Sequence, residues 1–231
     1  MKFLIKEKSI VSLEVKICGV TDANSVKAAV DSGADYIGFV FYPKSPRNIS
    51  ISDFKILTKY IPEKIAKVGL FVDPQNSLLE KVISAVKLDY IQLHGTESVE
   101  RICSIKNFFE TPVIKAIGIS VDKDFNKVKS IYDYVDQIIF DAKPSQKSLR
   151  PGGNALPFKW SLMSNYYGKK PWLLAGGLNI NNLKKAVAES GCKAVDVSSG
   201  VEIRPGIKDP ELIKSFVRFA KNISFEKLSD T

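Results

Sequence analysis

The sequence predicts an α/β fold: one closed barrel of eight parallel strands, with helices covering it on the outside. Short apolar runs recur eight times along the 231 residues, and stretches with the spacing of amphipathic helices lie between them. Strand then helix, repeated eight times, is typical of a single (β/α)8 or TIM barrel. The predicted strands are 13–18, 36–41, 66–72, 90–94, 113–117, 135–141, 172–175 and 194–198. The clearest helical stretches are 24–32, 77–86, 181–189 and 210–220.

The length of the chain suits one such domain. At 231 residues it is slightly shorter than the roughly 250 residues typical of these barrels, and it can bury one large core. No linker rich in Pro, Gly or Ser and no shift in composition divides it. We therefore expect one barrel domain over 13–223. An irregular or loosely docked N-terminal extension over 1–12 is expected before it, and a C-terminal tail over 224–231 after it.

Charge and composition narrow the possible partners. The net charge is +9, but the lysines are scattered through every segment rather than gathered in one stripe. This pattern favours a solvated basic surface, which would attract an anionic small molecule, over a nucleic-acid-binding protein. No apolar stretch approaches the about 18 residues needed to cross a membrane. The start of the chain is too short and too charged for a signal peptide.

The cysteines indicate a reducing compartment. Cys18, Cys103 and Cys192 form no Cys-x-x-Cys pair and no metal-ligand spacing with His94, the single histidine. A sparse, odd set of cysteines is typical of cytoplasmic proteins rather than of a disulfide framework. We expect a cytoplasmic protein without a metal.

The polar residues that end the strands are the first candidates for a site, because barrels of this class place their chemistry at the C-terminal ends of the strands. Alternation turns Lys16 and Cys18 of the first strand toward the interior, and Asp196 and Ser198 of the eighth. The first and eighth strands are neighbours once the barrel closes. Lys16 and Asp196 are therefore predicted to form a buried ion pair, since neither charge would be tolerated there alone.

Two of these strand ends suggest an acid and a base. Asp141 ends the sixth strand after three apolar residues, either as a cap of the following loop or as a general acid whose protonated form partial burial favours. Cys18 is either a small buried apolar residue or a general base. In the second case the ammonium of Lys16 would lower the pKa of the thiol. Cys18 and Asp141 are expected to face each other across the barrel mouth.

Glycines and serines after the last two strands suggest a phosphate site. Gly176 and Gly177 follow the seventh strand, and Ser198, Ser199 and Gly200 follow the eighth. In these barrels the backbone N–H groups of these two loops commonly hold a phosphate. The alternative is that the glycines only serve tight turns.

The loop after the second strand offers a site for a carboxylate. Pro43 and Pro46 stiffen this loop, and Arg47 follows them. A guanidinium held there can bind a carboxylate through two parallel hydrogen bonds, although a single arginine in a surface loop is usually only solvated.

Motifs along the chain resemble the phosphoribosylanthranilate isomerase family, from Val15 to Asp209. The similar stretches are VKICGVT (15–21), GFVFYPKSPR (38–47), VGLFV (68–72), IQLHG (91–95), IKA (114–116), LAGGL (174–178), VDVSSGVE (195–202), PG (205–206) and KD (208–209). The resemblance implies an Amadori rearrangement of N-(5-phosphoribosyl)anthranilate to 1-(o-carboxyphenylamino)-1-deoxyribulose 5-phosphate, a step of tryptophan biosynthesis. It implies no cofactor and no metal, a small phosphorylated substrate as partner, and a monomer.

The resemblance also implies roles for single residues. Cys18 matches the general base and Asp141 the general acid, Arg47 holds the anthranilate carboxylate, and the glycine and serine loops hold the phosphate. His94, at the end of the fourth strand, would shape the rim, either by touching substrate or by holding a loop. Lys16 and Asp196 are supporting residues.

The segment after the sixth strand has two notable features: one residue that departs from the family pattern and one candidate mobile loop. Lys159 stands where the family usually has an aspartate before a tryptophan, which puts the N-terminal capping of the sixth helix in doubt. The loop 142–156, rich in Pro, Gly, Ser and Lys, is the best candidate for a mobile lid.

Other functions remain as alternatives. A related sugar-phosphate isomerase of histidine biosynthesis would have an aspartate at the end of the first strand, where this chain has Cys18. A silent phosphate-binding barrel or a basic nucleic-acid module would need none of Cys18, Asp141 and Arg47.

Overall fold

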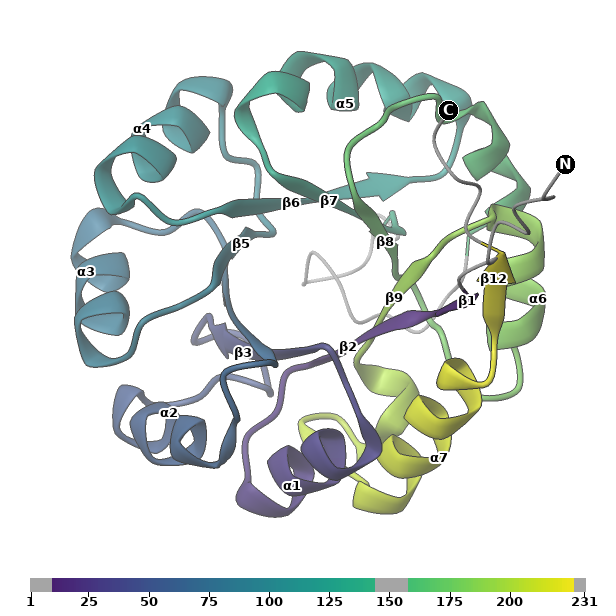
Figure 1. Cartoon of the computed structure of the whole chain (residues 1–231). Helices are drawn as coiled ribbons and strands as arrows, with labels where there is room; N and C mark the ends of the chain where they lie inside the picture. The colour runs from purple at the N-terminus through teal and green to yellow at the C-terminus, as the bar shows by residue number, and fades with distance from the viewer. Residues whose placement is uncertain (1–9, 144–157, 227–231) are drawn as a thin grey trace, which may run out of the picture.

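Eight parallel strands close into a barrel, as predicted (Figure 1). The computed structural model describes residues 10–143 and 158–226, without the side chains of residues 10, 11 and 226. The barrel strands follow one another in chain order, and the last pairs with the first. They are β2 (Glu14–Cys18), β3 (Tyr36–Phe41), β4 (Ala66–Phe71), β5 (Tyr90–Leu93), β6 (Val113–Ile119), β7 (Gln137–Ala142), β8 (Trp172–Leu174) and β9 (Ala194–Val197).

Helices surround the barrel between successive strands (Figure 1). The α-helices are α1 (Ala23–Ser32), α2 (Ile51–Leu57), α3 (Asn76–Ala85), α4 (Val99–Phe109), α5 (Phe125–Ile131), α6 (Leu183–Ser190) and α7 (Pro210–Lys221). Short 3-10 helices are η1 (Thr58–Tyr60), η2 (Asp122–Asp124), η3 (Tyr132–Tyr134), η4 (Trp160–Asn165) and η5 (Ser199–Val201). No helix of the described residues is long and apolar enough to span a membrane.

The last helix illustrates how local sequence sets these elements. The Asp209 side chain accepts hydrogen bonds from the Glu211 and Leu212 N–H groups, and Pro210 occupies the first turn, where its missing N–H costs nothing. The buried residues of α7 recur at helical spacing and form its barrel-facing side: Ile213, Phe216, Val217 and Ala220.

Strand alternation divides the core into two layers. Val15 and Ile17 of β2 are fully buried in the large cluster between the strands and the helices. A smaller apolar cluster fills the barrel interior, and its members lie in β4, β6, β7, β8 and β9 or directly after β8: Val68, Ile114, Ala116, Ile139, Leu173, Ala175 and Ala194. The interior of β2 instead carries Lys16, whose partner in the strand register is Asp196 of β9. The predicted inward positions are therefore confirmed.

The described part of the segment between β7 and β8, residues 158–171, contains no α-helix. The 3-10 helix η4 stands there, and the Lys159 side chain before it makes no capping hydrogen bond. This agrees with the expectation that a lysine at this point is a poor start for a helix.

Two small antiparallel sheets lie outside the barrel. β1 (Ile10–Ser12) pairs with β12 (Ser224–Glu226), so the described end of the predicted extension pairs with the start of the predicted tail. This pairing is regular structure that the sequence patterns did not indicate. β10 (Glu202–Arg204) and β11 (Ile207–Lys208) form a hairpin in the connection between β9 and α7.

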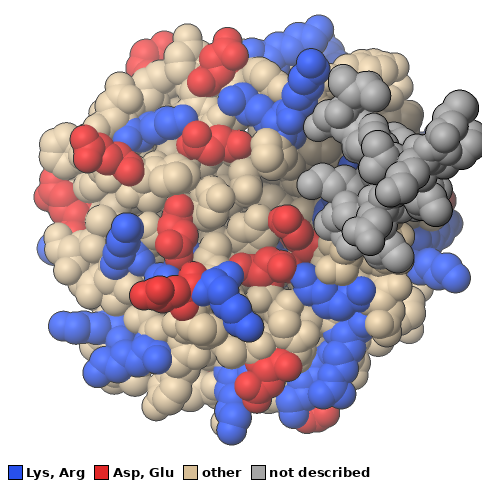
Figure 2. All heavy atoms as spheres, viewed as in Figure 1, with Lys and Arg blue, Asp and Glu red and all other residues tan. Residues whose placement is uncertain are grey.

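Basic side chains are spread over the face shown in Figure 2, where acidic side chains lie among them. This mixture agrees with the scattered lysines of the sequence.

Candidate active site

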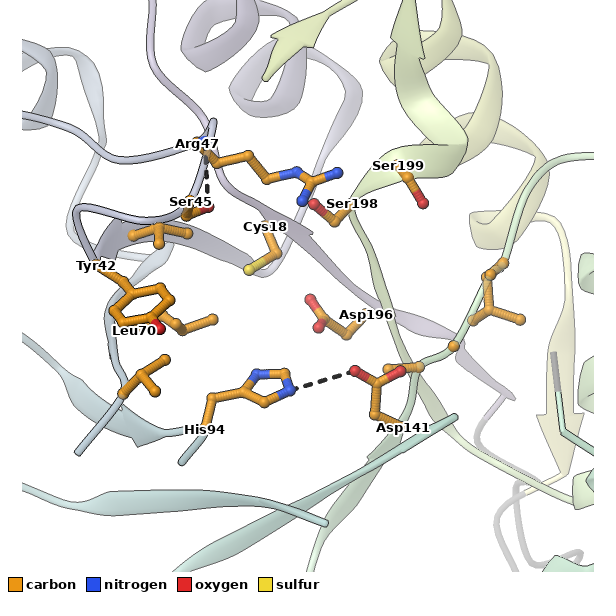
Figure 3. A pocket seen from close by; sticks show the side chains of 16 residues that line it. Cys18, Tyr42, Ser45, Arg47, Leu70, His94, Asp141, Asp196, Ser198 and Ser199 are labelled. Atoms are coloured by element: carbon orange, nitrogen blue, oxygen red, sulfur yellow. Dashed lines mark hydrogen bonds and ion pairs between the residues drawn. The ribbon is translucent and has the colours of Figure 1, made fainter. Parts of the chain in front are cut away.

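The C-terminal ends of the strands surround a cavity of about 730 Å³, a volume that includes open solvent at its mouth (Figure 3). The residues predicted from the strand ends come together there. Those that line it are Cys18, Arg47, His94, Asp141, Gly176, Gly177, Asp196, Ser198 and Ser199. Val40, Tyr42, Leu70 and Val72 form an apolar part of its wall. The thiol and the carboxyl that the sequence put forward as base and acid thus border one cavity.

Two predicted residues do not line the cavity. Lys16 lies beneath Cys18 and is fully buried. Gly200 packs against the backbone of Leu178, where a side chain would collide with the Leu178 carbonyl oxygen. Close packing therefore requires glycine at position 200.

The predicted buried ion pair is confirmed: Lys16 Nζ lies 2.9 Å from Asp196 Oδ1. Burial alone would lower the pKa of Lys16, but the Asp196 carboxylate and the Cys18 thiol raise it above its usual value. Gly38 of β3 leaves the space that Lys16 and Cys18 share. A Cβ atom at Gly38 would lie 3.1 Å from Lys16 Nζ and 3.2 Å from Cys18 Sγ.

The pKa of Cys18 moves in the direction opposite to the one expected. Burial raises the pKa of the thiol above its usual value, although the Lys16 ammonium acts to lower it. Desolvation of a thiolate at the bottom of the cavity outweighs the ammonium, and the nearby Asp196 carboxylate also disfavours a second negative charge. The expectation of a lowered thiol pKa was therefore wrong.

Asp141 is held by its own loop and by His94. Its Oδ1 accepts a hydrogen bond from the Ala142 N–H at 2.7 Å, as in the capping interpretation. Its Oδ2 lies 3.3 Å from His94 Nε2 (Figure 3). The Gln92 amide nitrogen lies 3.3 Å from His94 Nδ1. If this amide donates, Nε2 carries the ring proton of a neutral His94 and donates it to Asp141.

Gln92 is a neighbour of the His94 ring that the sequence analysis missed. It is fully buried, on the inward side of β5 two positions before His94. The alternation rule that placed Lys16 below Cys18 would also have placed Gln92 below His94.

The glycine loop after β8 requires glycine for its backbone. Gly176 and Gly177 have φ angles of +90° and +66°, in the left-handed region that glycine enters without strain. A Cβ atom at Gly176 would also lie 2.7 Å from the Ala142 nitrogen. Both glycines thus serve a tight turn, and both also line the cavity.

Lys208 supports the serine loop after β9 and was also missed. Its side chain is fully buried, and its Nζ donates to the Ser198 carbonyl oxygen at 2.9 Å and to Ser198 Oγ at 3.1 Å. Burial lowers the pKa of Lys208 below its usual value, against the opposite pull of Glu202. Lys208 lies in the hairpin, outside the barrel strands, so alternation gave no signal for it.

Arg47 is bound to a carboxylate of the protein itself. Its Nε lies 2.6 Å from Glu202 Oε1, and its Nη2 lies 2.8 Å from Glu202 Oε2. The two parallel hydrogen bonds expected for a ligand are thus made to Glu202. Nη1 makes no hydrogen bond within the described residues, and Arg47 still lines the cavity.

No three His, Cys, Asp or Glu side chains of the described ranges gather as metal ligands would. The proposed lid, residues 142–156, falls almost wholly in 144–157, which lies outside the described residues.

Known proteins resemble this chain over most of its length. The family model described as N-(5'phosphoribosyl)anthranilate (PRA) isomerase matches residues 15–219. The N-(5'-phosphoribosyl)anthranilate isomerase of Paramagnetospirillum magneticum is 44% identical over 209 residues, which cover 90% of this chain and 97% of that protein. The corresponding protein of Paracoccus denitrificans is 45% identical and covers 89% and 96%.

Solved structures agree with these relatives. The phosphoribosyl anthranilate isomerase of Thermotoga maritima matches with a TM-score of 0.80 and 37% identity, over 91% of this chain and 100% of that chain. A phosphoribosyl anthranilate isomerase in complex with reduced 1-(o-carboxyphenylamino)-1-deoxyribulose 5-phosphate matches with a TM-score of 0.77 and 36% identity, over the same shares of the two chains. The chain therefore belongs to the N-(5'-phosphoribosyl)anthranilate isomerase family.

Proposed function

We propose that this protein converts N-(5-phosphoribosyl)anthranilate to 1-(o-carboxyphenylamino)-1-deoxyribulose 5-phosphate, as an isomerase of tryptophan biosynthesis. The observation that carries the proposal is the placement of Cys18 and Asp141 on one cavity, with Arg47 and the glycine and serine loops at its rim. Family membership supports the reaction, and the geometry supports the roles of these residues.

Asp141 is the proposed general acid. The reaction begins when its carboxyl proton passes to the ribose ring oxygen while the C1–O bond breaks. The nitrogen lone pair then forms a C1=N double bond, so the opened sugar is a cationic imine and Asp141 is a carboxylate. The His94 Nε2 at 3.3 Å suits this step, because it can donate a hydrogen bond to the carboxylate that forms.

Cys18 is the proposed general base. The cationic imine makes the hydrogen on C2 acidic, and the thiolate of Cys18 removes it to give an enolamine. Since burial raises the pKa of the thiol, the thiolate depends on the ammonium of Lys16 beneath it. The cationic imine adds a second positive charge near the sulfur at the step in which the thiolate removes the C2 hydrogen.

Two further proton transfers then give the product, in which Asp141 accepts a proton and Cys18 donates one. The C2 hydroxyl loses its proton to the Asp141 carboxylate, and C1 gains the proton held by Cys18. The enolamine becomes the ketone, and both side chains return to their starting protonation states. Each proton transfer contributes roughly 10²- to 10⁴-fold to the rate.

Both ends of the substrate are anionic, and the site has a binding group for each end. We infer that the phosphate rests on the glycine loop at Gly176 and Gly177 and on Ser198 and Ser199. The anthranilate carboxylate meets the Nη1 end of Arg47, and the aromatic ring lies on the apolar wall. Holding both ends fixes C1 and C2 between the acid and the base.

The runner-up reactions need a different site. An isomerase of histidine biosynthesis would use an aspartate at the end of β2, and Cys18 stands there. A barrel that only binds phosphate, without catalysis, does not require a buried lysine below a thiol.

Asp141→Asn and Cys18→Ser test the assignment. With the substrate, the unmodified protein should cause a loss of anthranilate-type fluorescence, and both variants should abolish it. Both should still bind reduced 1-(o-carboxyphenylamino)-1-deoxyribulose 5-phosphate within a few-fold of the unmodified protein. Near-normal turnover by D141N would refute the acid assignment. Growth rescue of a tryptophan auxotroph tests the biological role.

We also propose that the protein acts as a cytoplasmic monomer on a small phosphorylated substrate, without nucleic acid or membrane partners. The free thiols of Cys18, Cys103 and Cys192 support a reducing compartment. Light scattering at working concentration tests the monomer, and a mass of two chains would refute it.

A further inference from the structure

Glu202 connects Arg47 with Lys208, the lysine that holds the serine loop. It follows η5 at the start of β10, and its side chain is only 4% exposed. Oε1 accepts hydrogen bonds from Arg47 Nε at 2.6 Å and from Lys208 Nζ at 2.9 Å, and Oε2 accepts one from Arg47 Nη2 at 2.8 Å. One buried carboxylate thus holds two buried cations that come from different loops.

The contact with Arg47 leaves one edge of the guanidinium for a ligand. Glu202 occupies the edge formed by Nε and Nη2. The edge formed by Nη1 and Nη2 still has two parallel N–H groups, which match the two oxygens of a carboxylate. In Figure 3 the guanidinium reaches across the cavity mouth toward Ser198. Glu202 therefore sets the direction in which the remaining edge points.

The contact with Lys208 reaches the serine loop. Lys208 Nζ donates to Glu202 Oε1, to the Ser198 carbonyl oxygen and to Ser198 Oγ, which uses its three N–H bonds. Because Ser198 Oγ accepts from Lys208, its own hydrogen points elsewhere and is available to an anion in the cavity. Through Lys208, Glu202 thus contributes to the position of the serine loop as well as to that of Arg47.

The charges of this cluster favour an anion. Two cations share one carboxylate, so the group carries a net positive charge at the cavity mouth. Burial would raise the pKa of Glu202, but the hydrogen bonds from Arg47 and Lys208 hold it below its usual value. Glu202 therefore stays ionised and keeps both contacts.

We propose that Glu202 is a positioning residue that orients Arg47 toward the substrate carboxylate. Through Lys208, Glu202 also connects Arg47 with the serine loop at Ser198, where the phosphate is proposed to bind. The site thereby selects ligands that carry a carboxylate and a phosphate at a set separation. The inference rests on the proposed function, because it takes Arg47 as the carboxylate grip.

The test compares two ligands that differ only in the carboxyl group. One is reduced 1-(o-carboxyphenylamino)-1-deoxyribulose 5-phosphate, and the other is the same compound made from aniline. The ratio of their Kd values, measured by calorimetry, reports how much the site gains from the carboxylate. The variants are Glu202→Gln, which removes the charge, and Glu202→Asp, which keeps the charge but shortens the side chain.

We expect both variants to reduce this preference for the carboxylated ligand on the order of tenfold, and Arg47→Ala to abolish it. In an Arg47→Ala background, Glu202→Gln should have no further effect on the ratio. Glu97→Gln is the matched control. Glu97 is another buried carboxylate paired with a lysine, at 2.8 Å from Lys115, and it contacts neither Arg47 nor Ser198. Its variant should keep the ratio unchanged.

Three results would overturn the inference. A ratio unchanged in both Glu202 variants, with Arg47→Ala effective, means that Glu202 only stabilises the loop. A ratio that rises in Glu202→Gln means that Glu202 merely competes with the ligand for Arg47. A ratio that Arg47→Ala leaves unchanged refutes the proposed role of Arg47, and the inference with it.

Discussion

Lys16→Met is the most informative single change in this protein, because it tests the buried pair and the thiol together. Lys16 is fully buried, and its ammonium lies 2.9 Å from Asp196 Oδ1. Removing one partner of a buried ion pair leaves an uncompensated charge and costs about 3–5 kcal/mol. With a urea m-value of about 3 kcal/mol/M, the midpoint of unfolding should fall by roughly 1–1.7 M.

The same change should act on Cys18. Lys16 is the main group that lowers the pKa of this thiol, against burial. Without the ammonium the pKa rises further, so less thiolate exists at a given pH. The rate of alkylation by iodoacetamide between pH 7 and 9 should fall about tenfold for each pKa unit gained. Turnover should fall with it.

Two companion variants separate stability from thiol chemistry. Lys115→Met breaks the buried Lys115–Glu97 pair on the outside of the barrel, so it should cost similar stability while leaving alkylation of Cys18 unchanged. Lys16→Met combined with Asp196→Leu removes both charges and should recover most of the lost stability, since an apolar pair can replace a buried ion pair. A Lys16→Met protein within about 0.5 kcal/mol of the original stability, with unchanged alkylation, would refute the reasoning.

Two further changes test the space around Lys16 and Cys18 and the titration of the buried Cys192 thiol. Gly38→Ala places a methyl group 3.1 Å from Lys16 Nζ and 3.2 Å from Cys18 Sγ. It should lower kcat at least tenfold at a stability cost of about 1–3 kcal/mol; an unchanged kcat would contradict the shared space. Burial raises the pKa of Cys192 from 9.0 to about 11, so its contribution to stability is present below pH 9 and is lost toward pH 11. Between pH 8 and 10 the original protein should lose roughly 1 kcal/mol more in urea unfolding than Cys192→Ala does; parallel curves would exclude this titration.

Much of the site could be predicted from the sequence because strand geometry is local. Alternation placed Lys16 below Cys18, and closure of the barrel placed Asp196 beside Lys16, as the strand register confirms. Asp141 lies near the end of β7 and His94 directly follows β5, and both line the cavity, as expected for residues at the C-terminal ends of barrel strands. The alternation rule also applies to Gln92, which lies two positions before His94 on the inward side of β5.

The partner of Arg47 could not be predicted in this way. Glu202 lies 155 positions away in the chain, in a hairpin whose path no local pattern describes. The same holds for Lys208, which reaches Ser198 from that hairpin. The pairing of β1 with β12 joins the two ends of the described chain, and it too depends on how the barrel closes.

The sequence by itself determined the eight strands and the side chains that turn inward, since inward and outward positions follow from a period of two residues along each strand. Only the tertiary structure decided the direction of the Cys18 pKa shift and the orientation of Arg47. The pKa of a thiol depends on how much water the surrounding strands exclude, and an arginine points where its partner holds it. Both are set by groups far apart in the chain, which become neighbours only when the barrel is closed.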